Sequence, residues 1–219
     1  MVEDATGGGM VQRCPCRLSP PPMSEALALA GVPERERTFT AEAMTAPQRA
    51  IADHVHATVD SGESILLMGP VGRGKTGVAV CELIRSLKAG RSGRWCRVGD
   101  WLRQLRAQFD APAGERVSEE ALLRDLHEAD LLIIDDLGAE YLTDWTRSMV
   151  HALVDGRDSS ARPFIATTNL PLASPAAGAP SIESVYGARV ASRLSRCARR
   201  SMGMSVPDLR ARGPAGAAG

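Results

Sequence analysis

A phosphate-binding loop is the stretch of this sequence whose residue types and spacing point most directly to chemistry. Residues Gly69–Thr76 read Gly-Pro-Val-Gly-Arg-Gly-Lys-Thr, which fits the pattern G-x-x-x-x-G-K-[ST]. Its glycines let backbone N–H groups turn toward an anion without obstruction by a Cβ atom. The Lys75 ammonium can reach the β- and γ-phosphates of a nucleotide, and the Thr76 hydroxyl can ligate Mg²⁺. The residues expected to bind the ATP phosphates are Gly69, Pro70, Val71, Gly72, Arg73, Gly74, Lys75 and Thr76.

The segments on either side of this loop have the patterns of a strand and a helix. Ser64–Met68 is a short apolar run, typical of a buried parallel strand. Gly77–Leu87 places its apolar residues on one helical face, and the N-terminus of such a helix attracts anions. We therefore interpret the loop as phosphate-binding rather than as a glycine-rich turn with an incidental lysine.

A second cluster of functional residue types follows about 60 residues later, in Leu131–Asp136. Four consecutive large aliphatic residues indicate a fully buried parallel strand, whose carboxyl end opens at the ligand crevice. We expect Asp135 to hold Mg²⁺ directly or through water, and Asp136 to act as base or positioner for the attacking water. A strand end often carries an acid, so it is the spacing from the phosphate-binding loop that favours this interpretation.

Asn169 ends a further expected strand, Pro163–Asn169. An asparagine there can hydrogen-bond the attacking water or the γ-phosphate. It can also serve only to end the strand and start the turn at Leu170-Pro171, which is the commoner role of such an asparagine. The residues alone leave both interpretations open.

Length and composition indicate one α/β domain without secretion or membrane signals. The chain has 219 residues, 44% of them hydrophobic, and a formal net charge of zero. No apolar run approaches the length of a membrane span, and the N-terminus lacks the apolar region of a signal peptide, so we expect a cytoplasmic protein.

The five cysteines are odd in number and scattered, which disfavours a disulfide framework. Cys14 and Cys16 offer at most two of the four ligands of a structural zinc site, and we expect His54 and His56 to be surface or packing residues.

Patterns of periodicity and capping place the remaining elements. We expect helices at 24–31 (capped by Ser24), 45–60, 100–109 (capped by Asp100), from Ser118 onward, 143–154 and 184–200, and strands at 95–98 and 202–206.

Arginines accumulate near the end of the chain. From Arg189 to Arg212 there are seven of them and one acid, Asp208, with Arg189, Arg193 and Arg196 on one helical face. We expect weak, salt-sensitive binding of single-stranded DNA through this segment; the alternative is a solvated basic helix end. The eight aromatic residues of the chain are too few to favour a base-stacking platform.

Together these motifs resemble the AAA+ ATPases, and more narrowly their DnaC/IstB branch. Gly69–Thr76, Leu131–Asp136 with Leu137-Gly138, Thr167-Thr-Asn169 and Arg189-Val-Ala-Ser-Arg-Leu194 occur in the order and spacing of that family. Ala30-Gly-Val-Pro33 resembles the start of the family's ATPase core, and the resemblance extends to about residue 210.

The resemblance implies a fold and a set of roles. The fold is an α/β P-loop NTPase of the AAA+/ASCE type, with a five-stranded parallel sheet in the order 5-1-4-3-2, flanked by helices and without a C-terminal lid. It would occupy residues 30–210, after a mostly disordered segment 1–29 and before a flexible tail 211–219. Asn169 would be the sensor that faces the γ-phosphate, and Arg193, or with less support Arg189, the arginine finger. Asp136 stands where many AAA+ proteins have Glu, which implies slow, partner-stimulated turnover.

The resemblance also implies function. The leading hypothesis is an ATP-hydrolysing replication accessory of the helicase-loader type, which forms a homo-oligomer on ATP binding, acts on single-stranded DNA and has a replicative helicase as partner, with no membrane involved. The alternatives are an IstB-like transposition helper with a transposase as partner, a small-molecule P-loop kinase, and a module that holds nucleotide without hydrolysing it.

Overall fold

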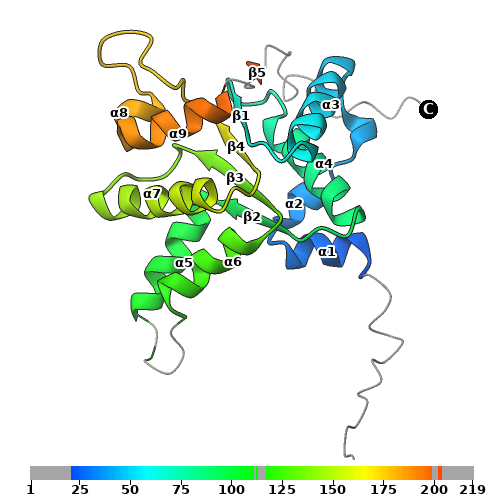
Figure 1. Cartoon of the computed structure of the whole chain (residues 1–219), viewed down its shortest axis with the longest axis horizontal. Coiled ribbons are helices and arrows are strands. Elements are labelled where there is room, and N and C mark those ends of the chain that lie inside the picture. The colour runs from blue at the N-terminus through cyan, green and yellow to red at the C-terminus, as the bar shows by residue number, and fades with distance from the viewer. Residues whose placement is uncertain (1–20, 111, 113–116, 199–201, 204–219) are drawn as a thin grey trace, which may run out of the picture.

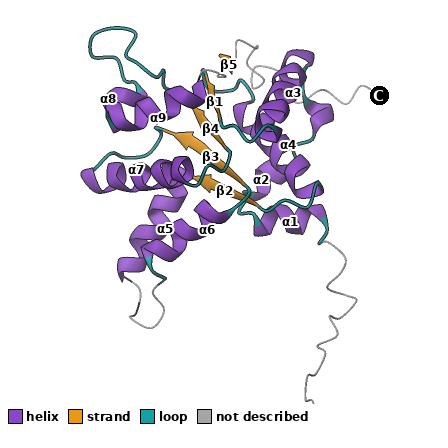
Figure 2. Ribbon diagram, in the orientation of Figure 1, coloured by secondary structure: helices purple, strands orange, loops and turns teal. Residues whose placement is uncertain are grey.

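A twisted parallel sheet runs through the centre of the molecule (Figure 2). The computed structural model describes residues 21–110, 112, 117–198 and 202–203. Four full strands, β1 (Ile65–Met68), β2 (Gly93–Arg97), β3 (Leu131–Leu137) and β4 (Phe164–Thr168), lie in the order β2-β3-β4-β1. A two-residue strand, β5 (Met202–Gly203), pairs with the free edge of β1. The α/β prediction and the order 1-4-3-2 are confirmed. Of the fifth strand expected at 202–206, the structure describes Met202 and Gly203, and residues 204–206 lie outside the described part of the chain.

Helices cover both faces of the sheet (Figure 1). One face carries α1 (Met23–Leu29), α3 (Ala46–Asp60) and α4 (Lys75–Lys88), with the short α2 (Glu34–Arg37) and η2 (Ala41–Ala43) beside them. The other carries α5 (Val98–Asp110), α6 (Glu119–Glu128), α7 (Asp144–Ser159), α8 (Ile182–Tyr186) and α9 (Ala188–Ala198). Within the described residues, none of these helices has the length and apolarity that crossing a bilayer requires.

The continuous apolar run of β3 is explained by this two-faced burial. Leu131 and Ile133 pack into the core on the α3–α4 side, whereas Leu132 and Ile134 pack into the core on the α5–α9 side. All four side chains are buried because successive residues of a strand point to opposite faces. This burial fixes the position of β3 in the core, and therefore the place of Asp135 and Asp136 near its carboxyl end.

Several expected helix starts are confirmed by their caps. The Gln48 side chain accepts a hydrogen bond from the Thr45 backbone N–H at 2.9 Å, directly before α3. Ser118 Oγ accepts from the Ala121 N–H at 3.1 Å at the start of α6. These bonds satisfy N–H groups that have no partner inside the helix.

Three expectations need correction. The helix expected at 184–200 is two helices, α8 and α9, separated at Gly187, whose φ of 86° lies in the left-handed region. Helix α5 begins at Val98, so Asp100 lies inside it rather than capping it. Helix α1 follows Pro22 rather than Ser24, and its Leu27 is buried in the core, so the packed domain includes residues that we assigned to the N-terminal segment.

Two further expectations fall outside the described part of the chain. They concern Cys14 and Cys16, which lie within residues 1–20, and the expected tail, which lies within residues 204–219.

A buried arginine joins α7 to the end of α6. The Arg157 side chain has no exposed surface, and its Nη1 donates to the carbonyl oxygens of Leu126, His127 and Ala129 at 3.3, 2.9 and 2.7 Å. Its Nη2 donates to the Pro163 carbonyl, directly before β4. Burial lowers the pKa of Arg157 to about 10, so the guanidinium remains charged at neutral pH. It satisfies carbonyls at a helix end, where the helix itself supplies no N–H donors.

Arg157→Ala should therefore lower the free energy of unfolding by about 2–4 kcal/mol, because it leaves several buried carbonyls without a donor. Urea denaturation followed by circular dichroism measures this change. Arg124→Ala is the control, since Arg124 is exposed on α6, and it should change stability by less than about 0.5 kcal/mol. Equal effects of the two substitutions would contradict the anchoring role.

Candidate functional site

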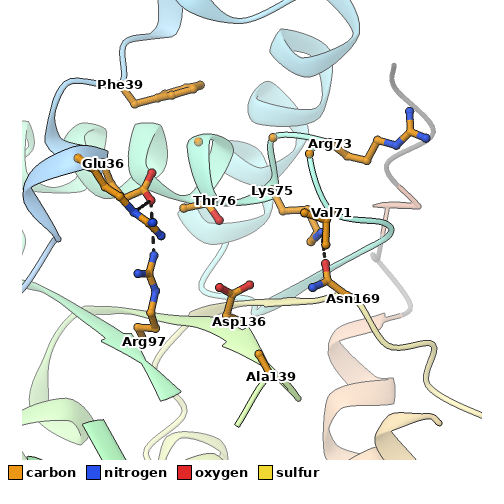
Figure 3. Close-up of a pocket in the computed structure, with 14 residues that line it drawn as sticks. Glu36, Phe39, Val71, Arg73, Lys75, Thr76, Arg97, Asp136, Ala139 and Asn169 are labelled. Carbon is orange, nitrogen blue, oxygen red and sulfur yellow. Dashed lines mark hydrogen bonds and ion pairs between the residues drawn. The ribbon is translucent and has the colours of Figure 1, made fainter. Parts of the chain in front are cut away.

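A pocket of about 430 Å³ opens at the carboxyl ends of the strands (Figure 3). The predicted phosphate-binding loop forms one wall, α2 and the residues after it form another, and the ends of β2, β3 and β4 form the floor. The residues lining it are Arg35, Glu36, Phe39, residues 71–77, Arg97, Asp136, Ala139 and Asn169. Chain segments separated by more than 100 residues thus meet in one cavity, at the edge of a parallel sheet where ligands characteristically bind.

The loop has the backbone conformation that its glycines permit. Gly69, Gly72 and Gly74 have φ values of 144°, 82° and 85°, which side chains with a Cβ rarely adopt. Helix α4 begins at Lys75, directly after Gly74. The loop therefore delivers the free N–H groups and the positive dipole end of a 14-residue helix to the pocket, an arrangement that attracts phosphate.

Lys75 is held in place by neutral acceptors. Its Nζ donates to the carbonyl oxygens of Gly69 and Pro70 at 2.7 and 2.9 Å, and to Asn169 Oδ1 at 2.7 Å. The residue is only 6% exposed although it lines the pocket. The structure thus brings Asn169 into contact with the lysine of the loop. Gly69 and Pro70 do not line the cavity, and their carbonyl oxygens bind Lys75 instead.

Asp135 is a fully buried carboxylate at the end of β3. Its Oδ1 accepts hydrogen bonds from Thr76 Oγ1 at 3.1 Å and from Thr167 Oγ1 at 2.8 Å. Burial raises the pKa of Asp135, and the hydrogen bond from Thr167 and the Arg97 cation oppose that rise. The adjacent hydroxyl of Thr76 and carboxylate of Asp135 are hard oxygen donors, a set that suits Mg²⁺.

Asp136 emerges into the pocket through an irregularity in β3. The register between β3 and β4 shifts between Ile134 and Leu137, and Asp136 has a φ of 58°, unusual for a residue with a side chain. Its N–H donates to Thr167 Oγ1 at 3.0 Å. Figure 3 shows the Asp136 carboxylate on the pocket floor, facing the start of α4. A single hydroxyl, that of Thr167, thus orients both aspartates, and a strained backbone at this point suggests a functional reason.

Sequence reasoning missed the wall formed by residues 35–39 and Arg97. The Phe39 ring packs over the first turn of α4 so closely that a Cβ on Gly77 would lie 2.3 Å from its Cζ. Arg97, the last residue of β2, lies 3.4 Å from Asp135 Oδ2 and 3.5 Å from Glu36 Oε1. The available signal was a charged residue at the end of an apolar strand, where its side chain can enter the ligand crevice.

The predicted arginine finger lies outside this pocket. Arg193 on α9 pairs with Asp155 on α7 at 2.8 Å, Arg189 pairs with the same carboxylate at 3.1 Å, and Arg196 pairs with Asp158 at 2.5 Å. The expected basic face is therefore neutralised in part by two acids from a neighbouring helix. Other charged residues of the arginine-rich segment lie outside the described part of the chain: Arg199, Arg200, Asp208, Arg210 and Arg212.

The two histidines of α3 behave as expected of surface or packing residues. His54 is exposed, and His56 Nδ1 lies 3.1 Å from the buried Glu82 carboxylate. Nowhere in the described segments do three His, Cys, Asp or Glu side chains gather in a way that could hold a metal ion.

Comparison with known proteins agrees with this geometry. Residues 23–177 match the family model of IstB-like ATP-binding proteins. The chain belongs to this family. The predicted DnaC/IstB relationship is thereby confirmed, and the match begins at the first residue of α1.

Curated relatives of this IstB-like protein include members of both branches of the resemblance. The replicative helicase loader DnaC of Escherichia coli K12 is 32% identical over 106 residues, which are 48% of this chain and 42% of DnaC. An ATP-binding protein of insertion sequence IS1162 from Pseudomonas fluorescens is 32% identical over 137 residues, 59% of this chain and 56% of that protein. The chain thus spans about half the length of the curated relatives it matches.

A solved structure shows the same fold. The crystal structure of the DnaC helicase loader superposes with a TM-score of 0.60 at 21% identity, covering 75% of this chain and 96% of that one. At this identity the likeness concerns the fold, and it agrees with the α/β arrangement described above.

Lys75→Ala should lower ATP affinity at least tenfold, because it removes the ammonium aimed at the phosphates. Isothermal titration with a non-hydrolysable ATP analogue measures the loss. Lys88→Ala is the matched control, since Lys88 is the other lysine of the chain and lies exposed at the far end of α4. Unchanged affinity in Lys75→Ala would place the nucleotide elsewhere.

Proposed function

We propose that this IstB-like protein hydrolyses ATP in the pocket and acts as an ATP-driven accessory of DNA replication, of the helicase-loader type. The observation that carries the proposal is the arrangement around Thr167. Its hydroxyl bonds the buried Asp135, which also contacts Thr76 of the loop, and bonds the backbone of Asp136, which faces the cavity. An ATPase needs one acid to bind the metal ion and a second acid to activate water. Asp135, which contacts the loop hydroxyl, suits the first task, and Asp136, which faces the cavity, suits the second.

In this proposal each side chain has a distinct task. Lys75 exchanges its three neutral acceptors for phosphate oxygens, which releases Asn169 Oδ1 and frees the amide to contact the γ-phosphate or the attacking water. Thr76 and Asp135 hold Mg²⁺, which when bound neutralises charge on the β- and γ-phosphates. Asp136 orients the attacking water and accepts its proton. Its side chain is one methylene shorter than glutamate, which is consistent with slow, partner-stimulated turnover.

The partner follows from the relatives. One is named a replicative helicase loader, and we propose a replicative helicase as the partner of this chain. The insertion-sequence relative favours a second candidate, a transposition helper that works with a transposase. ATPase assays with the purified helicase or transposase of the same host separate the two. Stimulation by the helicase supports the loader proposal, and stimulation by the transposase alone would replace it with the second candidate.

An aromatic patch supports action on single-stranded DNA. Phe109 and Trp145 meet edge to face with centroids 6.0 Å apart, and the Arg106 guanidinium lies 5.2 Å from the Trp145 ring. Tyr141 is 87% exposed and lines a neighbouring groove of about 330 Å³ together with Arg103 and Arg106. Aromatic faces beside arginines are the composition that stacks bases and attracts phosphates. Although the sequence has few aromatic residues, the fold brings Phe109 into contact with Trp145 and places Tyr141 on a groove beside Arg106.

Tyr141→Ala should weaken binding of oligo(dT) about five- to hundredfold without loss of stability, because an exposed ring available for stacking is removed. Fluorescence anisotropy at two salt concentrations measures this, and affinity should fall as salt rises. Leu29→Ala, at an exposed apolar residue of α1, is the control. If Tyr141→Ala binds oligo(dT) with wild-type affinity, and removal of residues 199–212 abolishes binding, the DNA site lies in the arginine-rich segment instead.

We further propose that each ATP site is completed by Arg193 of a neighbouring copy, since this residue lies on α9 outside its own pocket. Arg193→Ala and Asp136→Asn should each bind ATP yet hydrolyse it at least about a hundredfold more slowly. A mixture of the two variants should recover part of the wild-type rate, because some interfaces pair an intact Asp136 with an intact Arg193. A phosphate-release assay at several protein concentrations measures recovery. Mixed oligomers that form but stay inactive would show that Arg193 does not act across the interface.

A further inference from the structure

Arg97 lies between two carboxylates at the metal side of the site. Its Nη2 is 3.4 Å from Asp135 Oδ2 and 3.5 Å from Glu36 Oε1, and the side chain is 17% exposed. Figure 3 shows the guanidinium below Glu36, on the side of the pocket opposite Lys75 and Asn169. Arg97 belongs to neither the phosphate-binding loop nor the aspartate pair, and the roles proposed above leave it without a task.

Asp135 needs a cation whenever no metal is bound, because a fully buried carboxylate without a countercharge is strongly destabilising. Lys75 Nζ donates to Gly69, Pro70 and Asn169, on the other side of the pocket. Among the ion pairs of the described residues, the one that Asp135 makes is with Arg97. Arg97 therefore occupies the role of countercharge to the carboxylate that we assign to Mg²⁺.

Glu36 gives Arg97 a second position. This carboxylate belongs to α2, and its Oε1 also accepts from Arg35 Nε at 2.8 Å. Its side chain is 19% exposed, whereas Asp135 has no exposed surface, so Glu36 tolerates the loss or gain of a partner more easily. Helix α2 and Phe39 form the wall of the pocket above Arg97, so a change in this ion pair reaches residues that line the nucleotide site.

We propose that Arg97 is a positioning residue that exchanges between Asp135 and Glu36 according to the occupancy of the metal site. Without metal it pairs with both carboxylates and holds the Asp135 side chain in its orientation. With Mg²⁺ and nucleotide bound, Arg97 withdraws to Glu36, because two cations beside one buried carboxylate repel each other. The wall formed by α2 thereby responds to the metal. This inference rests on the proposed function, since it assumes that a magnesium nucleotide binds in this pocket.

The exchange predicts opposite effects of two substitutions on metal affinity. Arg97→Gln removes the competing cation, so Mg²⁺ should bind the protein–nucleotide complex about three- to tenfold more tightly. Glu36→Gln removes the alternative acceptor and keeps Arg97 on Asp135, so Mg²⁺ should bind about three- to tenfold more weakly. A merely structural role would weaken metal binding in both variants or in neither.

The measurement uses a fluorescent, non-hydrolysable ATP analogue with protein in excess, so that all nucleotide is bound before Mg²⁺ is titrated. Arg94→Gln is the matched control, because Arg94 lies on the same strand but pairs with Asp125 on α6 at 2.8 Å. It should leave the Mg²⁺ midpoint unchanged. Circular dichroism checks that each variant is folded, and Glu36→Gln tests the same exchange with Arg97 intact if Arg97→Gln does not fold.

The outcomes separate this inference from the proposed function. Absence of nucleotide binding by the wild-type protein, with and without Mg²⁺, would overturn the proposed function itself. Normal nucleotide binding with the same Mg²⁺ midpoint in Arg97→Gln, Glu36→Gln and wild type would overturn only the exchange. Loss of nucleotide binding by Arg97→Gln in the presence of EDTA would also overturn it, since Arg97 would then be a direct phosphate ligand.

Discussion

The buried carboxylate of Asp135 is the constraint on which the site depends. Burying such a charge costs several kcal/mol unless hydrogen bonds and a cation compensate it. Here the hydroxyls come from Thr76 at the start of α4 and Thr167 in β4, and the cation comes from Arg97 at the end of β2. The start of α4 and the ends of β2 and β4 must therefore lie beside Asp135, so the requirement to satisfy one acid also aligns the phosphate-binding loop with the sheet.

The loop that follows the aspartates is tied to the helices beyond β4. Glu140 Oε2 accepts from the Gly138 N–H at 3.1 Å, and the same carboxylate accepts a hydrogen bond from the buried Tyr186 hydroxyl on α8. Burial beside this carboxylate raises the pKa of Tyr186, so its hydroxyl stays protonated and remains a donor. This chain of contacts connects the backbone after Asp136 to the α8–α9 pair, which carries Arg193. The backbone that follows Asp136 is therefore held partly by a side chain from the helices beyond β4.

The local charge of the surface depends on ion pairs between neighbouring helices, and cannot be read from the distribution of charged residues along the chain. Asp155 and Asp158 on α7 engage three arginines of α9, which removes much of the basic character that α9 has as an isolated helix. The aromatic patch arises in the opposite way, since Phe109 lies near the end of α5 whereas Trp145 lies near the start of α7, and packing brings them together. Both features depend on which helices are neighbours.

The sequence by itself determined the loop, the strand that carries two aspartates near its carboxyl end, and the family. These features depend on local rules: glycines permit the left-handed backbone of Gly72 and Gly74, and an apolar run such as Leu131–Ile134 must be buried on both faces. Only the tertiary structure decided that Thr167 orients both acids, that Arg97 and α2 form a wall of the pocket, and that Arg193 lies away from its own pocket. Those contacts join elements far apart in the chain, and their geometry follows from strand order and helix packing, which no local pattern of residues specifies.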